Sequence, residues 1–296
     1  MSAFADRLIE AVRAKQTPLC VGLDPFPDRI PALFGDANAD VETLMRFGDA
    51  IIEIAAEHAA VLKPQLGLFE PFGPDGVRIA RDLCQRARDA GMIVILDAKR
   101  GDIGSTAQGY ARAALGPAPG FDADCVTVNP YLGMDSLEPF IASAAKADKG
   151  VAVLARTSNP GARDLQDLDV AGAPLWRRTA EMLAPALPRL KGETGWSGLM
   201  IVAGATYPGE ARALRESLPE GLFLVPGYGA QGASAADAIA GFVTGKYGLE
   251  GGVVNSSRGV TYPAAAHAAQ NMAAWRDAIR AAMAGAAQDL KQACAA

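Results

Sequence analysis

Short apolar runs recur along the chain, and each is followed by a segment with helical spacing. The runs contain few polar residues and show little alternation between polar and apolar positions. This pattern is typical of parallel strands that are buried on both faces of a sheet. We therefore predict eight strands, at residues 19–23, 61–66, 92–96, 125–128, 151–155, 199–203, 222–225 and 252–255.

The segments between the runs have the period of amphipathic helices. Leu44, Phe47 and Ile51 recur every three or four residues, and Pro174 stands where a further helix would begin. A short helix is expected at the N-terminus and a long alanine-rich helix at 263–286. Residues 159–172 and 116–122 are expected to be long loops and candidate lids, and the tail 287–296 to be loosely held.

Eight alternating strand and helix units predict an α/β fold, a (β/α)8 TIM barrel that forms a single domain over residues 1–296. Half of the 296 residues are hydrophobic, which is enough for a core of that size. The net charge of -5, with both signs interspersed, argues against a nucleic-acid-binding protein. We expect no nucleic-acid partner.

The sequence also predicts a cytoplasmic protein with no membrane partner. No apolar run reaches the roughly 18 residues of a membrane span, and Asp6, Arg7 and Glu10 interrupt any signal peptide. The four cysteines show neither a CxxC pair nor zinc spacing, so free thiols in a reducing compartment are expected.

Polar residues follow the predicted strands at their carboxyl ends, the face on which (β/α)8 barrels carry out chemistry. Residues 96–106 read Leu-Asp-Ala-Lys-Arg-Gly-Asp-Ile-Gly-Ser-Thr. In an extended chain the side chains of Asp97 and Lys99 point to the same side. Together with Lys63 and Asp102 they would form an array of two cations and two carboxylates. A solvated salt-bridge cluster is the alternative, but the flanking strands are too apolar for an ordinary exposed face.

Two further segments indicate a phosphate site. Residues 226–232 contain Gly229 and Gly232 and follow the seventh strand, while 255–259 contain Arg258 and follow the eighth. Glycines let backbone N–H groups approach a ligand closely, and an arginine can bind phosphate through a forked contact. Barrels often build phosphate sites from these two loops.

Other chemistries lack their characteristic residues. The two histidines, His58 and His267, lie in predicted helices, so catalysis by a histidine-activated nucleophile is not expected. The sequence also has no Walker A motif, no GxGxxG after the first strand and no HExxH.

At this point the motifs resemble a known family. Asp97-x-Lys99-x-x-Asp102-Ile103-x-x-Thr106 resembles the active-site signature of the orotidine 5'-phosphate decarboxylases. Residues 19–25, Lys63, 226–232 and 255–259 are similar to that family's other motifs, in the same order and over nearly the whole chain. The residues after Lys63, and 156–160, look like its longer bacterial subgroup, type 2.

The resemblance implies an activity and an assembly. It implies decarboxylation of orotidine 5'-monophosphate to UMP and CO2, the last step of de novo pyrimidine biosynthesis, with no cofactor and no metal. It also implies a homodimer whose active sites are shared between subunits.

The resemblance further implies a role for each site residue. Lys99 would give a proton to the ring carbon that CO2 leaves, Asp97 would lie beside the substrate carboxylate, and Asp24 and Lys63 would bind the ribose. The other implied contacts are Asp102, Ile103 and Thr106 in the neighbouring subunit's site, Gln231 and Arg258 with backbone N–H groups at the phosphate, and Ser158 or Thr157 at the pyrimidine.

The residue types suit this reaction, because direct decarboxylation leaves negative charge on a carbon with no adjacent electron sink. A cofactor usually supplies such a sink; without one, a cation such as Lys99 must stabilise the charge. Three alternatives stay open: a metal-dependent sugar-phosphate decarboxylase or hexulose-phosphate synthase of the same superfamily, a Schiff-base aldolase using Lys63 or Lys99, and a non-catalytic barrel that binds a phosphate ligand.

Overall fold

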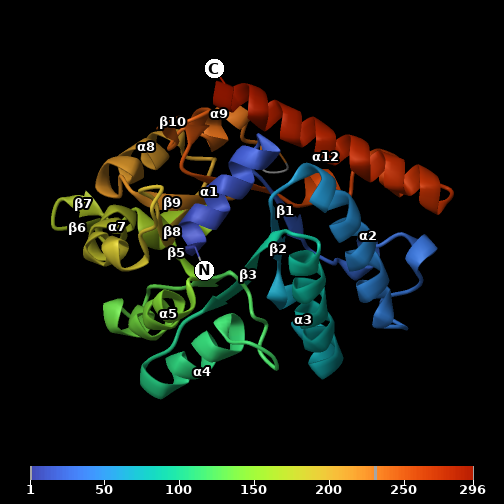
Figure 1. Ribbon diagram of the computed structural model, residues 1–296, viewed down its shortest axis with the longest axis horizontal. Coiled ribbons are helices and arrows are strands. Elements are labelled where there is room, and N and C mark those ends of the chain that lie inside the picture. Colours follow the sequence, from blue (N-terminus) through green and yellow to red (C-terminus); the bar gives the residue numbers. More distant parts are fainter. Residues whose placement is uncertain (1, 230–231, 296) are drawn as a thin grey trace.

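The computed structural model describes residues 2–229 and 232–295, and its central feature is a closed barrel of eight parallel strands (Figure 1). The order around the barrel is β1-β12-β9-β8-β5-β4-β3-β2. The predicted (β/α)8 fold is confirmed, and each barrel strand overlaps one predicted apolar run. Their bounds are β1 Leu19–Leu23, β2 Val61–Pro64, β3 Ile93–Arg100, β4 Cys125–Val128, β5 Gly150–Arg156, β8 Ser197–Ala203, β9 Gly221–Val225 and β12 Gly252–Ser256.

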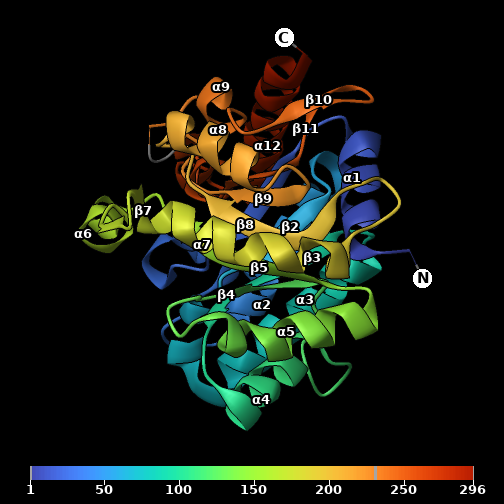
Figure 2. The same cartoon turned by 90° about the vertical axis from the view of Figure 1, so that its left-hand side faces the viewer.

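Helices surround the barrel and bury their apolar faces against it (Figures 1 and 2). In α2, for example, Leu44, Phe47 and Ile51 are fully buried, as the helical spacing predicted. The bounds of the helices are α1 Phe4–Lys15, α2 Glu42–His58, α3 Gly73–Asp89, α4 Gly104–Leu115, α5 Met134–Ala147, α6 Arg163–Gln166, α7 Leu175–Leu183, α8 Pro208–Ser217, α9 Ala235–Ala238, α10 Arg258–Thr261, α11 Ala264–His267 and α12 Met272–Ala295.

The C-terminal region differs from the prediction in two ways. The alanine-rich stretch 263–286 is not one helix, because α11 ends at His267 and α12 begins at Met272. Asn271 begins the second helix: its side-chain oxygen accepts the N–H of Ala274, as an N-cap residue does. The expectation of a loose tail is wrong for residues 287–295, since α12 continues through them and Leu290 is fully buried.

The two predicted lid loops also differ from expectation. Residues 159–172 contain α6 and the short strand β6 (Asp169–Val170), which pairs with β7 (Ala173–Pro174), and Figure 2 shows this excursion projecting beside α7. Residues 116–122 lead into the start of β4, at the end of the barrel opposite the strand carboxyl ends, so they cannot cover the predicted polar face. A second hairpin, β10 (Val243–Gly245) with β11 (Gly248–Glu250), was not predicted.

The helix α1 closes the amino-terminal end of the barrel, and Figure 1 shows it over the middle of the ring. Its Phe4, Leu8 and Ile9 cluster with side chains from the barrel strands. Gly150, the first residue of β5, makes room for this helix: a Cβ there would lie 2.5 Å from the Phe4 ring. The predicted N-terminal helix therefore acts as the floor of the barrel.

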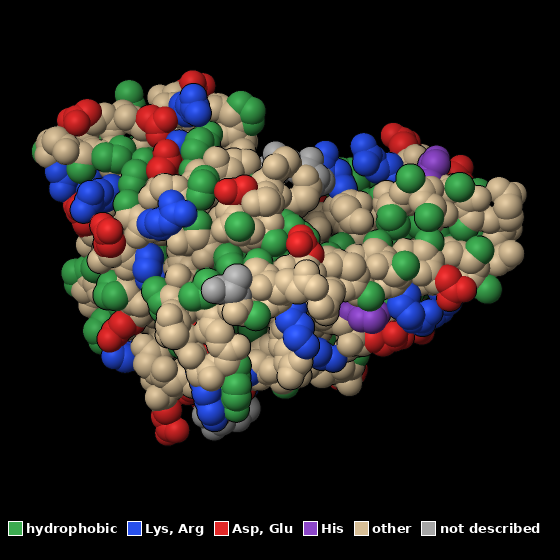
Figure 3. All heavy atoms as spheres, turned by 90° about the horizontal axis from the view of Figure 1, so that it is seen from above, with side chains coloured by type: hydrophobic (Ala, Val, Ile, Leu, Met, Phe, Trp, Pro, Cys, Tyr) green, Lys and Arg blue, Asp and Glu red, His purple; other side chains and the backbone are tan. Residues whose placement is uncertain are grey.

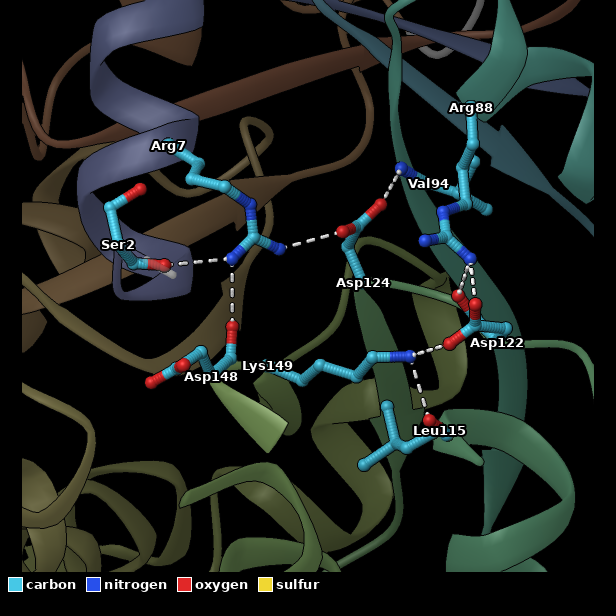
Figure 4. Close-up of polar contacts among 9 residues, drawn as sticks. All are labelled: Ser2, Arg7, Arg88, Val94, Leu115, Asp122, Asp124, Asp148 and Lys149. Atoms are coloured by element: carbon cyan, nitrogen blue, oxygen red, sulfur yellow. Dashed lines mark hydrogen bonds and ion pairs between the residues drawn. The ribbon is translucent and has the colours of Figure 1, made fainter. Parts of the chain in front are cut away.

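Ion pairs fasten this floor (Figure 4). Arg7 of α1 donates a hydrogen bond of 2.7 Å to Asp124, whose other carboxylate oxygen accepts the N–H of Val94 in β3 at 3.0 Å. Beside it, Lys149 donates to Asp122, which holds the 116–122 loop in place. These polar interactions therefore help to close the amino-terminal end of the barrel.

The outer surface carries mixed charge. On the face shown in Figure 3, basic and acidic side chains are interspersed rather than gathered by sign. Across the described ranges, 2–229 and 232–295, no helix is both long enough and apolar enough to cross a membrane.

Candidate active site

A charged array lies at the carboxyl ends of β2 and β3. Asp97 accepts hydrogen bonds from two ammonium groups, with 2.7 Å between Lys63 Nζ and Oδ2 and 2.5 Å between Lys99 Nζ and Oδ1. The side chains of Lys63 and Asp97 are buried, whereas that of Lys99 is 46% exposed. The structure thus brings these three predicted residues together, with Lys99 facing the open end of the barrel.

The backbone of β3 turns Lys99 toward this position. Lys99 has a φ of +46°, in the left-handed region that few residues other than glycine adopt. The register between β3 and β4 also shifts between Leu96 and Arg100. Such conformations persist where surrounding structure enforces them, and they occur often at functional sites.

Charge pairing dominates the ionisation of the array. Burial alone would raise the pKa of Asp97, but Lys63 and Lys99 outweigh it and hold that pKa well below its usual range. Burial alone would lower the pKa of Lys63, but Asp97 and Asp24 outweigh it and raise that pKa above its usual value. Both groups therefore stay charged at neutral pH.

Two residues that the sequence analysis missed complete the contacts of Asp97. Gln65 Nε2 donates to Oδ2 at 3.0 Å, and the Thr127 hydroxyl donates to Oδ1 at 2.9 Å. Gln65 stands two positions after Lys63, so strand alternation could have placed it on the same side. Thr127 had a weaker signal, as the one polar residue within the β4 run.

Asp24, at the end of β1, presents an unpaired polar atom. Its Oδ1 is buried and has no hydrogen-bond partner in the described part of the chain. Leaving a buried acceptor unpaired costs about 1–3 kcal/mol. This atom is therefore suited to accept a hydrogen bond from a ligand hydroxyl.

The two predicted phosphate loops follow β12 and β9, the two strands that come next after β1 around the barrel. Gly229 and Gly232 have φ values of +72° and +91°, and the Gly232 N–H donates to the Gly229 carbonyl. Gln231 lies outside the described residues. Arg258 is exposed and is the first residue of α10.

The loop after β12 packs closely on β1. A Cβ at Gly22 would lie 1.8 Å from Ser257 Oγ and 3.1 Å from Asn255 Oδ1. Glycine at position 22 therefore lets the Arg258 loop approach the strand that carries Asp24.

The two candidate pyrimidine contacts, Thr157 and Ser158, lie in the loop after β5 and differ in their hydrogen bonds. The Thr157 hydroxyl accepts a hydrogen bond from Gln166 Nε2 at 2.8 Å and donates one to Asn159 Oδ1 at 2.6 Å. The Ser158 side chain makes no hydrogen bond with the described residues, and it lines a cavity of about 610 Å³ together with Thr206 and Tyr207. Ser158 is thus the better placed of the two to contact a ligand.

The predicted fourth member of the array, Asp102, does not contact the two lysines within the described part of this chain. Asp102 accepts the N–H of Ile103 at 2.8 Å, and within the described residues it makes no ion pair with Lys63 or Lys99. Ile103, the residue before α4, and Thr106, in its first turn, are exposed. The structure therefore leaves these three residues free to meet another molecule.

Comparisons with known proteins identify the family of the chain. A model of the orotidine 5'-phosphate decarboxylase / HUMPS family matches residues 17–273. The orotidine 5'-phosphate decarboxylase of Haloarcula marismortui is 44% identical, over 88% of this chain and 87% of its own length. That of Leptothrix cholodnii is 41% identical, over 96% of this chain and 99% of its own.

A solved structure is similar over almost the whole length. The Leishmania donovani OMP decarboxylase superposes with a TM-score of 0.77 at 33% identity, covering 99% of this chain and 98% of that one. From the matched family model and these relatives, the chain belongs to the orotidine 5'-phosphate decarboxylase / HUMPS family.

Proposed function

We propose that the protein decarboxylates orotidine 5'-monophosphate to UMP and CO2, as the last step of de novo pyrimidine biosynthesis. The observation that carries this proposal is the buried carboxylate of Asp97 held between the ammonium groups of Lys63 and Lys99 at the barrel mouth. Relatives more than 40% identical over most of the chain bear the name of this enzyme.

Lys99 is the proposed proton donor. When the bond to CO2 breaks, its electron pair remains on the ring carbon. A nearby ammonium group stabilises this charge more in the transition state than in the ground state. Transfer of one proton from Lys99 Nζ then forms the new C–H bond and leaves a neutral amine. The exposure of Lys99 toward the open end of the barrel permits this contact.

Asp97 and Lys63 hold Lys99 in place and shape the ribose side of the site. Asp97 accepts hydrogen bonds from both lysines, and we propose that it lies beside the substrate carboxylate. The unpaired Oδ1 of Asp24 would accept a ribose hydroxyl, and Ser158 would contact the pyrimidine ring.

The phosphate is the proposed remote anchor. Arg258 would bind it together with Gln231 and backbone groups near Gly229 and Gly232. Binding energy from such an unreactive group can hold loops and charged residues in their reactive arrangement. The phosphate loops would therefore affect turnover as well as affinity.

The alternatives fit the site less well. A metal-dependent sugar-phosphate enzyme of this superfamily would bind a divalent cation through several carboxylates. Both oxygens of Asp97 already accept hydrogen bonds from lysines, and the described residues contain no cluster of three acidic, histidine or cysteine side chains that could hold a metal ion. A Schiff base needs a neutral amine, and the raised pKa of Lys63 disfavours that form. We propose a reaction without metal or cofactor.

The direct test is to add orotidine 5'-monophosphate to purified protein treated with EDTA and to follow its ultraviolet absorbance. We expect the absorbance to fall at the same rate with and without EDTA. If the absorbance does not change while a known decarboxylase is active in a parallel sample, the decarboxylase assignment is refuted. Activity that returns only with added Mg²⁺ would favour the metal-dependent alternative, and covalent trapping by borohydride would reveal a Schiff base.

Arg258→Ala should weaken both binding and turnover. Hydrogen bonds to charged groups contribute about 1.5–3 kcal/mol, so we expect kcat/KM to fall by about 10- to 150-fold. Steady-state kinetics would measure this. Arg177→Ala, a partly exposed arginine on the outer helix α7, is the matched control. Unchanged kinetics in Arg258→Ala would contradict the phosphate assignment.

We also propose a homodimer with shared active sites. The supporting feature is an apolar patch near the ends of β3 and β4, where Ile103 is 56% exposed, Tyr131 75% and Leu132 47%. Large exposed apolar patches commonly mark interfaces. Asp102 and Thr106 border the patch, so a partner packed there would receive them at its own site.

Mixing two inactive variants tests this assembly. Lys99→Ala and Asp102→Ala should each lose activity alone. If sites are shared, a mixed dimer contains one site with both Lys99 and Asp102 intact, so activity should return after the variants are unfolded and refolded together. Failure to regain activity, with mixed dimers shown by mass spectrometry, would refute shared sites.

Two broader expectations stay proposals. We propose that the whole chain is one domain, because the first and last strands of the barrel, β1 and β12, pair with each other. We also propose a cytoplasmic location, supported by four cysteines that are all free thiols.

A further inference from the structure

Thr127 lies in the middle of β4, and its hydroxyl contacts two residues of the charged array. It donates to Asp97 Oδ1 at 2.9 Å and accepts the backbone N–H of Lys99 at 2.9 Å. The residue is buried. A single hydroxyl therefore joins the carboxylate of one array residue to the backbone of another.

These two contacts act on the part of β3 with the most unusual backbone. Lys99 has a positive φ, and the β3–β4 register shifts beside it. A strand whose ladder is interrupted leaves backbone N–H groups without their usual carbonyl partners. The Thr127 hydroxyl takes the place of such a carbonyl for the Lys99 N–H, and this bond fixes the conformation that directs the Lys99 side chain toward Asp97.

We propose that Thr127 is a positioning residue for proton transfer from Lys99, an inference that rests on the decarboxylase function proposed above. Thr127 is not expected to touch the substrate itself. Its acceptor role holds the Lys99 backbone, and its donor role fixes the orientation of the Asp97 carboxylate against which the Lys99 ammonium lies.

The donor role has a second effect during the reaction. When Lys99 gives up its proton, Asp97 loses one of its two cationic partners and keeps Lys63. The Thr127 hydroxyl still donates to the same oxygen that Lys99 contacted, so the buried carboxylate is not left with an unpaired oxygen at that moment. Thr127 would thereby limit movement of Asp97 between the two protonation states of Lys99.

The test compares Thr127→Val, which keeps the shape but removes the hydroxyl, with Thr127→Ser, which keeps the hydroxyl. For Thr127→Val we expect kcat to fall by about 10²-fold, the size of effect that a small misplacement of reacting groups can have. KM and the Kd for UMP should stay near the wild-type values. Thr127→Ser should keep most of the activity.

Two further measurements separate positioning from general damage. Hydrogen exchange should show a less protected Lys99 amide in Thr127→Val than in Thr127→Ser. Thr43→Val is the matched control, because Thr43 is also buried and bonded by its hydroxyl, to Arg46 on α2, away from the array. This control should lose stability without the change in kcat.

The outcomes are distinguishable. A Thr127→Val enzyme with wild-type kcat, or a Thr127→Ser enzyme as slow as Thr127→Val, would overturn the positioning role. A fall in kcat matched by a loss of UMP binding would also overturn it, since a disturbed pocket would then suffice. Wild-type protein without any decarboxylase activity would instead refute the proposed function on which the inference rests.

Discussion

Replacing Lys99 by alanine should nearly abolish decarboxylation while leaving the barrel folded. General acid catalysis contributes about 10²- to 10⁴-fold, and a preorganised group at a developing charge contributes about 10²- to 10³-fold. Lys99 supplies both, so we expect kcat to fall by about 10⁴- to 10⁷-fold. Nearly half of its side chain is exposed, so its removal leaves no cavity in the core.

Single-turnover kinetics with orotidine 5'-monophosphate would measure this loss, and thermal unfolding would check the fold. Lys146→Ala, at an exposed position on the outer helix α5, is the matched control and should keep full activity. Appreciable turnover by Lys99→Ala would show that another group donates the proton.

Replacing Asp97 by alanine should have the largest effect on stability. Lys63 would remain buried without its main acceptor, and removing one partner of a buried ion pair costs about 3–5 kcal/mol. Urea unfolding should show a loss of this size. The double variant Lys63→Met, Asp97→Ala has no unpaired buried ammonium group. It should therefore recover much of the free energy of unfolding that Asp97→Ala loses, but not the activity.

The free energy of unfolding should depend on pH in opposite ranges in the wild type and in Asp97→Ala. In the wild-type protein the pKa of Asp97 is lowered by folding, so its contribution to stability is complete above the unfolded value of about 3.9 and is lost as the pH falls through the folded value. In Asp97→Ala, burial should instead lower the pKa of Lys63. The unfolded chain then binds more protons, and the variant should regain stability as the pH rises toward about 10.4.

Asp75→Ala, at an exposed position in the first turn of α3, controls for the loss of a carboxylate as such. Equal unfolding free energies of Asp97→Ala and the wild type would mean that Lys63 finds water or another acceptor, and the array would then be less enclosed than the structure indicates.

The barrel could be predicted because its strands are buried on both faces, which makes each of them an apolar run in the sequence. The alternation of side chains along a strand was enough to put Asp97 and Lys99 on one side. The break between α11 and α12 could not be foreseen in the same way. Alanine favours helix throughout this stretch, and a single asparagine, Asn271, is an ambiguous signal.

The charged residues of the site could be predicted from the sequence. Residues whose role depends on local backbone geometry or on another chain could not. Lys63 and Asp97 are rare as buried residues, so they stand out in apolar strands. Thr127 does not, because threonine is common in strands and its role depends on the local shift between β3 and β4. Asp102 cannot be placed from one chain, since its proposed target belongs to another.

The closed floor of the barrel has a consequence for how the chain folds during synthesis. Arg7 leaves the ribosome 117 residues before its partner Asp124, and β1 must wait for β12 before the sheet can close. Until then the apolar side of α1 has only part of its native surface to bury, because its cluster includes Val253 of β12. Nascent chains of this protein should therefore depend on chaperones until translation is nearly finished.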